Sequence, residues 1–140
     1  MGDLAPRKDR RDGWPMRDVS WAFRGDAFSD RQEFSQKVLE WQGPESTHSW
    51  LPHEVVLQYP RVRIEYFGVI DPAEDEYADL SLDLNADNGE YFTGEELLFK
   101  LHNAVVAQLR EADHQYFEGL EPRAPSNSDG LPIYRMQQGS

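Results

Sequence analysis

The chain has 140 residues, near the size of one domain and enough to bury a hydrophobic core. It contains no cysteine, which excludes disulfides, thiolate nucleophiles, iron–sulfur clusters and cysteine zinc sites. Its formal net charge of −12 repels nucleic acid and anionic membranes and attracts cationic proteins. No stretch resembles a signal peptide or approaches the roughly 18 apolar residues of a membrane helix. We therefore expect a soluble cytoplasmic protein that binds neither nucleic acid nor membrane.

The negative charge is concentrated in one segment. Residues 71–121 contain fourteen acidic residues against only Lys100 and Arg110, whereas the charges of residues 1–30 balance. Two interpretations remain open at this point. The acidic segment either keeps the protein soluble or forms a face that binds a basic partner.

The amino-terminal residues differ in character from the rest of the chain. Basic and acidic side chains alternate over residues 1–17 without apolar periodicity, and Gly13 and Pro15 interrupt any regular element. We expect a flexible arm there, followed by a single α+β domain over residues 18–140.

The domain begins with a predicted strand and a predicted helix. Alternating apolar residues indicate a strand over residues 19–28. Ser29 is expected to cap a helix over residues 30–42, because Gln32 follows at the capping-box spacing. The apolar stripe of this helix consists of Phe34, Val38 and Trp41. In the next loop, Trp50 and Leu51 are expected to point inward.

A hairpin is predicted in the middle of the chain. Residues 54–70 predict either two strands separated by Pro60 or one strand that bends there on an exposed edge. Residues 77–85 predict a strand that follows an acidic loop. Folded back as a hairpin, the polar faces would carry opposite charges. The residues expected to pair across it are Arg61 and Arg63 with Asp79 and Asp83.

The best-defined predicted element is a helix over residues 94–112. Thr93 and Glu96 have the spacing of a capping box, and apolar residues cover about half of the helix circumference. Such a helix is expected to lie flat on a sheet. Residues 114–121 and 131–137 predict two further strands.

The element order is β-α-β-β-α-β with one additional carboxy-terminal strand. This order is typical of a ferredoxin-like fold, in which two helices pack on one face of an antiparallel sheet. We therefore predict that architecture for residues 18–140.

No histidine stands in a recognisable catalytic or metal-binding pattern. His48, His53, His102 and His114 lack metal-ligand spacing, and no nucleophile elbow or phosphate loop is present. His102 lies within the apolar arc of the second helix. It is either a buried general base or, as we favour, a core histidine bonded to a backbone carbonyl or an acid.

The stretch Asp83, Asn85, Asp87 partly matches a calcium-binding loop. Position 6 of such a loop needs glycine and position 12 needs glutamate, but Asn88 and Gly94 occupy these positions. A strand edge, an Asn-Gly turn and a helix cap account for the same residues. The sequence therefore predicts no metal and no cofactor.

These observations predict a non-enzymatic acidic protein, of inhibitor or immunity type, that binds a basic protein as a monomer or weak homodimer. Two alternatives remain: a small ligand-binding or enzymatic domain with a pocket between helix and sheet, and an assembly subunit that pairs through a sheet edge. The predicted partner-binding residues are Asp71, Glu74, Asp75, Glu76, Tyr77, Asp87, Glu90, Tyr91, Glu95 and Glu118.

Overall fold

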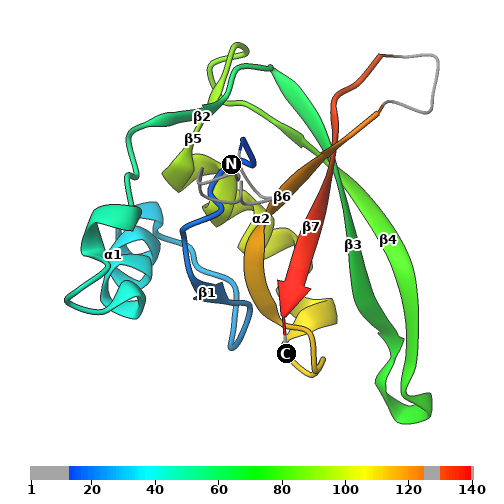
Figure 1. Ribbon diagram of the computed structural model, residues 1–140. Coiled ribbons are helices and arrows are strands. Elements are labelled where there is room, and N and C mark those ends of the chain that lie inside the picture. Colours follow the sequence, from blue (N-terminus) through cyan, green and yellow to red (C-terminus); the bar gives the residue numbers. More distant parts are fainter. Residues whose placement is uncertain (1–12, 125–129, 140) are drawn as a thin grey trace, which may run out of the picture.

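The computed structural model describes residues 13–124 and 130–139, which form an α+β fold with two α-helices, a five-stranded sheet and a two-stranded sheet (Figure 1). The predicted α+β class is thus confirmed. In chain order, with η marking a 3-10 helix, the elements are β1 (Trp21–Ala22), α1 (Arg31–Gln42), η1 (Thr47–Ser49), β2 (Val55–Leu57), β3 (Arg61–Asp71), η2 (Pro72–Glu74), β4 (Glu76–Asn85), β5 (Phe92–Thr93), α2 (Gly94–Leu109), β6 (Tyr116–Arg123) and β7 (Ile133–Gly139).

The five-stranded sheet is mixed rather than antiparallel, with the strand order β1-β6-β7-β3-β4. The β3–β4 and β6–β7 pairs are antiparallel, and β7 runs parallel to β3. The predicted antiparallel sheet with ferredoxin-like order was therefore wrong in the direction of the β3–β7 pair and in the details of the strand order. The last strand, predicted as an addition to the fold, lies between β6 and β3, because residues 133–135 pair with residues 63–65.

The helix α2 lies against this sheet and supplies much of the core (Figure 1). The hydroxyl of Thr93 accepts a hydrogen bond from the Glu96 backbone N–H at 3.3 Å, so the predicted cap is confirmed. The Glu96 carboxylate does not complete a capping box. It accepts a bond from the Asp87 N–H at 2.7 Å instead, which ties the preceding loop to the helix.

The helix α1 packs beside α2 and β1, and two expectations about it were wrong. Its N-cap is Asp30 rather than Ser29, since the Asp30 carboxylate accepts from the N–H groups of Gln32 and Glu33. Trp41 is 41% exposed, because the residues that α1 buries are Phe34 and Val38. The Trp41 ring rests on the molecular surface, edge-on to the core residue Trp21.

The segment before α1 contains less strand than expected. The pairing of β1 with β6 covers only Trp21 and Ala22, after which Gly25 adopts a φ of +71° and the chain bends away. In the loop after α1, Trp50 is buried and donates its indole N–H to Ser35, as expected of an inward residue. Leu51 is 52% exposed, so the prediction that it points inward was wrong.

The β3–β4 hairpin is confirmed, with Pro60 separating β2 from β3. Asp83 accepts hydrogen bonds from Arg61 and Arg63, as predicted. Asp79 does not pair with either arginine, because it stands opposite Phe67 and forms its ion pair with Arg135 of β7 at 2.9 Å. The sequence pattern could not show this contact because β7 approaches from outside the hairpin.

The two carboxy-terminal strands form a hairpin whose limits differ from the expected ones. The strand β6 begins two residues later than predicted and includes Pro122, and β7 extends to Gly139. Residues 13–17 pack beside β6, where the Leu120 N–H donates to the Pro15 carbonyl at 3.4 Å. Residues 1–12, which make up most of the predicted arm, lie outside the described residues. Among the described helices, none is long and apolar enough to cross a membrane.

Candidate functional site

Four of the predicted partner-binding carboxylates come together where β3 turns into β4 (Figure 1). The turn is the single 3-10 turn η2. Its first residue is Pro72, and the Asp71 carboxylate caps it by accepting from the Ala73 N–H at 3.1 Å. Asp75 closes the turn in the left-handed conformation, with φ of +53°. We call Asp71, Glu74, Asp75 and Glu76 the hairpin-end carboxylates.

The hairpin-end carboxylates have no cationic neighbour among the described residues. The ion pairs formed within the described part of the chain use acids in other places, such as Asp83 with Arg63 and Asp79 with Arg135. A fifth acid joins this end of the molecule, because Asp113 from the α2–β6 loop lies beside Tyr77. The end of the hairpin is therefore a local excess of negative charge.

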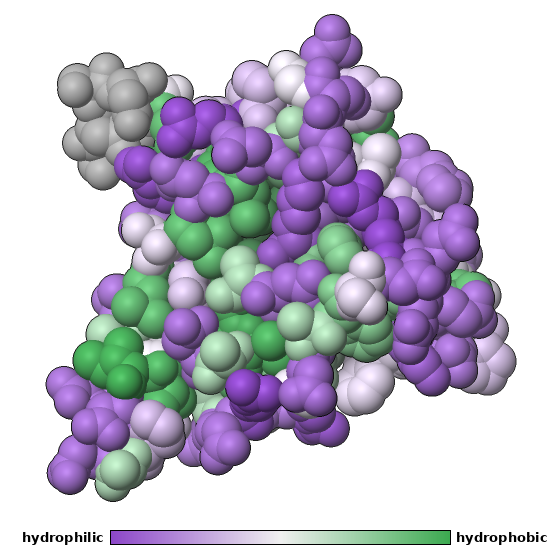
Figure 2. All heavy atoms as spheres, turned by 180° about the vertical axis from the view of Figure 1, so that it is seen from behind, coloured by the Kyte–Doolittle hydropathy of each residue, from purple (hydrophilic) through white to green (hydrophobic). Residues whose placement is uncertain are grey.

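Apolar groups accompany these carboxylates. Tyr77 stacks on Phe67, with ring centroids 5.3 Å apart and planes within 5°. Partial burial raises the pKa of the Tyr77 hydroxyl, and the nearby carboxylates of Asp75 and Asp113 raise it further. Ile70 leaves half of its side chain exposed. In Figure 2, apolar atoms lie beside hydrophilic ones at the lower left, where this end of the hairpin is found.

A second group of predicted residues lies at the opposite end of β4, about 30 Å away along a ten-residue strand. This group contains Asp87, Glu90, Tyr91 and Glu95. Asp87 is already neutralised, since its carboxylate binds Lys100 at 2.7 Å and Arg31 at 2.9 Å. These hydrogen bonds, the Lys100 contact foremost, hold the pKa of Asp87 below its usual value.

The ten predicted residues therefore do not form one surface. Glu118 stands apart from both groups, on β6, where its carboxylate lies beside Gly139. The residues that sequence reasoning missed at the hairpin end are Phe67, Ile70 and Asp113. Phe67 gave a weak signal, because it is an apolar residue on the polar face of the alternating pattern. Alternation places Ile70 on the core face, and the irregular pairing between Val69 and Asp71 leaves it exposed instead. No sequence signal links Asp113 to Tyr77, because the two residues are 36 positions apart and meet only through the fold.

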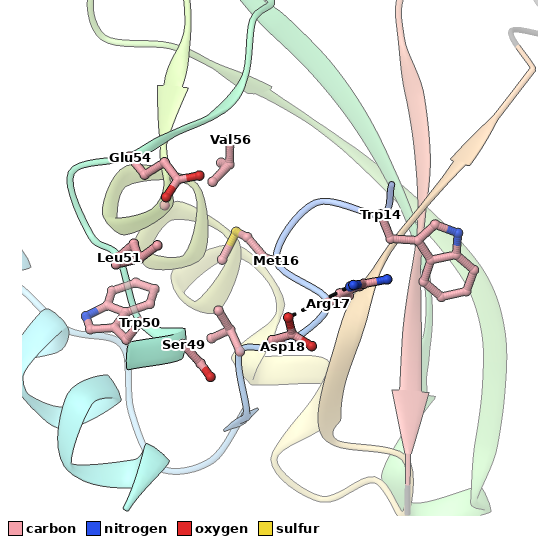
Figure 3. Close-up of a pocket in the computed structure, with 11 residues that line it drawn as sticks. Trp14, Met16, Arg17, Asp18, Ser49, Trp50, Leu51, Glu54 and Val56 are labelled. Carbon is pink, nitrogen blue, oxygen red and sulfur yellow. Dashed lines mark ion pairs between the residues drawn. The ribbon is translucent and has the colours of Figure 1, made fainter. Parts of the chain in front are cut away.

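A small hollow lies between the amino-terminal turn, the loop before β2 and the start of α2 (Figure 3). Its volume is about 210 Å³. Met16, Trp50, Leu51 and Val56 give it apolar walls, and Glu54 adds a carboxylate at its rim (Figure 3). Pockets that bind drug-sized ligands are usually about 300–1,000 Å³. This hollow is therefore large enough for a small fragment or a side chain.

His102 is a core residue, as favoured from the sequence. It is fully buried between aromatic rings, among them Trp21 and Phe34. The Trp21 indole N–H donates to His102 Nδ1 at 3.1 Å, so Nε2 carries the proton and donates to the Asp26 carbonyl at 3.0 Å. Burial lowers the pKa of this imidazole, although the bond to Asp26 opposes the shift. The ring is neutral and both its nitrogens are occupied.

The calcium-like stretch is occupied by other interactions. Asp83 binds two arginines, and Asp87 binds Lys100 and Arg31. Hydrogen bonds from Arg63 lower the pKa of Asp83, and the nearby Arg61 adds to this effect. Among the described residues, no three acidic or histidine side chains stand close enough together to hold a metal ion.

The chain matches no family model, no curated protein and no solved structure.

Proposed function

We propose that this chain is a non-enzymatic, cytoplasmic acidic protein that binds a basic protein partner, as an inhibitor or immunity-type protein does. The observation that carries the proposal is the set of hairpin-end carboxylates without cationic neighbours among the described residues, placed beside the exposed Ile70 and the half-buried Tyr77. Elsewhere in the described structure, acids such as Asp79, Asp83 and Asp87 are paired with arginine or lysine.

The two components of this surface have different physical effects. Unpaired surface charge steers an oppositely charged partner and raises the association rate, an effect that salt screens over about 8 Å at physiological ionic strength. An exposed aliphatic residue beside an aromatic one provides apolar area that is buried after docking and slows dissociation. The hairpin end combines both on a rigid two-stranded support.

The experiment compares affinity capture from a lysate by three forms of the chain. The test variant is Glu74→Lys/Glu76→Lys, which reverses two hairpin-end charges and spares Asp75, whose left-handed conformation suits lysine poorly. The matched control is Glu40→Lys/Glu45→Lys, which makes the same change in net charge on exposed residues of α1 and the loop after it. Each capture is repeated at low and high salt.

The expected result is a basic protein that the wild type and the control retain at low salt and that the test variant loses. Association of the purified partner should slow about tenfold or more in the test variant and become less sensitive to salt. Equal retention by the two double variants would show that net charge alone attracts the protein. That result would contradict a specific site at the hairpin end.

The hollow at Met16 and Trp50 supports a second candidate function, the binding of a small molecule in a pocket. Its size limits the ligand to a fragment. A fragment screen by NMR would test this function through the Gly94 amide and the Trp50 indole, since both residues line the hollow. Shift changes at these groups that Val56→Trp removes, by filling the hollow, would support it, and unchanged spectra with every fragment would exclude it.

A further inference from the structure

Among the described strands, β4 forms one edge of the five-stranded sheet and has a neighbour on one side only, β3. It is ten residues long, and Figure 1 shows it along the outer border of the sheet. An edge strand of this length offers a row of backbone N–H and C=O groups to an incoming strand.

The register shows which residues of β4 present these groups. The Ala86 N–H donates to the Pro60 carbonyl at 2.8 Å, which places residues 60 and 86 in a hydrogen-bonded pair. Because such pairs alternate along antiparallel strands, Leu84, Leu82 and Leu80 direct their backbone groups towards β3. The residues between them, Asp83, Ser81 and Asp79, direct theirs away from the sheet. The Asn85 carbonyl, which also points outward, already accepts from Lys100 Nζ at 2.6 Å.

The side chains of β4 offer two different faces to an added strand. Asp79 and Asp83 lie on the polar face, and the Asp79 side chain is 74% exposed despite its ion pair with Arg135. Leu80 and Leu82 on the other face are only partly buried, whereas Leu84 is buried. Figure 2 shows apolar surface on the side of the molecule where β4 lies. Asp83 is less accessible, because Arg61 and Arg63 bind its carboxylate. A neighbouring strand would therefore meet mainly Asp79 on one face and leucines on the other.

A second copy of this chain fits this edge poorly. The β4 strands of two copies could pair in two antiparallel registers that keep their polar side chains on the same face. Among registers that do so, these two have the longest overlap. One of them places Asp79 directly opposite Asp83 of the other copy, and the second places two Asp79 side chains diagonally adjacent. Arginines offset part of these charges, but each copy also carries a net charge of −12, which opposes self-association. A strand with cationic residues opposite the exposed Asp79 is attracted to this edge instead.

We propose that the free edge of β4 binds an extended segment of the basic partner as a sixth strand, in which cationic side chains alternate with apolar ones. The cationic side chains lie over the exposed Asp79 and towards the hairpin-end carboxylates, and the apolar side chains cover Leu80 and Leu82. This inference rests on the proposed function and adds the mode of docking. The hairpin-end carboxylates stand at the start of the same strand, so they attract the segment towards the edge that it pairs with.

The test uses a short synthetic peptide that alternates lysine with valine and threonine. Hydrogen exchange of the wild-type protein is measured with and without the peptide. We expect new protection at the amides of Asp79, Ser81 and Asp83, which are the N–H groups that point outward. A peptide with glutamate in place of lysine controls for charge. A second control peptide is N-methylated at every second residue. It lacks the backbone N–H donors along one of its own edges, so it tests whether binding requires strand pairing.

The matched protein variants are Ser81→Pro and Ser81→Ala. Proline removes the outward N–H of residue 81 and leaves the hydrogen bonds to β3 intact, as is usual for proline in an edge strand. Alanine keeps this N–H. We expect peptide binding to weaken about tenfold in Ser81→Pro and to change less than about twofold in Ser81→Ala. If Ser81→Pro does not fold, the N-methylated peptide gives the same comparison with the wild-type protein.

Binding of the N-methylated peptide as tight as that of its parent would overturn this inference, as would peptide binding without protection on β4. The hairpin-end variant Glu74→Lys/Glu76→Lys separates the two proposals. If the captured partner depends on the hairpin-end charges and leaves the β4 amides unprotected, the proposed function stands and strand addition fails. If the lysine peptide protects β4 in wild type and variant alike while no basic protein is captured, the proposed function fails instead.

Discussion

The side-chain amide of Gln138 holds the main chain of Phe67 with two hydrogen bonds, one in each direction. The Phe67 N–H donates to Gln138 Oε1 at 2.8 Å, and Gln138 Nε2 donates to the Phe67 carbonyl at 2.9 Å. The backbones of β3 and β7 pair only over residues 63–65 and 133–135, after which the two strands separate. The amide therefore takes the place of a strand residue where the sheet opens. Asn103 holds Phe28 in the same way.

Gln138→Glu should destabilise the protein by about 1–3 kcal/mol, since a carboxylate cannot donate to the Phe67 and His114 carbonyls and would leave both without this donor. Gln58→Glu makes the same chemical change at an exposed position and should alter the free energy of unfolding by less than about 0.5 kcal/mol. Urea denaturation of both variants measures the difference. Equal stabilities would show that the sheet does not depend on this amide bridge.

His102 should make the protein less stable as the pH falls from about 6.5. Burial lowers the pKa of the folded imidazole, so below pH 6.5 the unfolded chain takes up a proton that the folded chain does not. The free energy of unfolding should then decrease by up to about 1.4 kcal/mol per pH unit, until the pH reaches the folded pKa. The carboxyl groups with lowered pKa, Asp83 and Asp87, lose their contribution only at lower pH, below about 3.8.

Denaturation measured at several pH values above 4 separates these effects. The variant His102→Gln keeps a donor and an acceptor in the core but does not titrate, so its stability should stay level between pH 6.5 and about 5. A wild-type protein with the same stability throughout this range would contradict the buried neutral imidazole. A slope that persists in His102→Gln would assign the proton uptake to another group.

The parts of the fold that depend on neighbours in the sequence were predictable. The start of α2 follows from Thr93, and the β3–β4 hairpin follows from alternation on both sides of a turn, with Arg63 facing Asp83. In each case the interacting groups belong to one element or to two elements joined by a short loop. Local preferences and tertiary packing agree in these regions, so pattern and structure coincide.

The parts that depend on contacts between distant segments were not predictable. The parallel pairing of β7 with β3 joins residues about 70 positions apart, and nothing in residues 131–137 indicates a parallel partner. Trp41 has the spacing of a buried residue, but α1 lies at the border of the fold and turns this residue outward. The fold also separates the carboxylates predicted to bind a partner: one group lies at each end of β4, and Glu118 lies on β6.

Lys100 should be the most important cation for stability. Its ammonium group binds Asp87 at 2.7 Å and Glu96 at 2.8 Å, and the Glu96 side chain is only 7% exposed. Burial opposes the charged form, but these hydrogen bonds raise the pKa of Lys100 overall. Lys100→Met leaves the Glu96 carboxylate buried without its cation and should cost about 1–3 kcal/mol.

A double-mutant cycle with Glu96→Gln measures the coupling between these two residues by chemical denaturation. Glu96→Gln in the Lys100→Met background should recover part of the loss, because it removes the buried negative charge. Lys37→Met on the exposed side of α1 is the control and should be nearly neutral. A cycle with no coupling energy would show that water replaces Lys100 without cost.

Charge and apolar area at the hairpin end should affect different rate constants for the captured partner. Ile70→Ser removes an exposed aliphatic side chain and should leave the fold within about 0.5 kcal/mol of wild type. It should raise the dissociation rate while association stays within about twofold, because no charge changes. The Glu74→Lys/Glu76→Lys variant should do the reverse and mainly slow association.

Leu51→Ser is the matched control for Ile70→Ser, since Leu51 is 52% exposed, Ile70 is 50% exposed, and the two residues belong to different parts of the fold. Surface plasmon resonance at two salt concentrations resolves both rate constants for each variant. If Leu51→Ser raises the dissociation rate and Ile70→Ser does not, the partner contacts the region of the hollow instead of the hairpin end. If Ile70→Ser slows association as strongly as the charge reversal does, the apolar group acts in the first encounter, and the assignment of steering to the carboxylates is wrong.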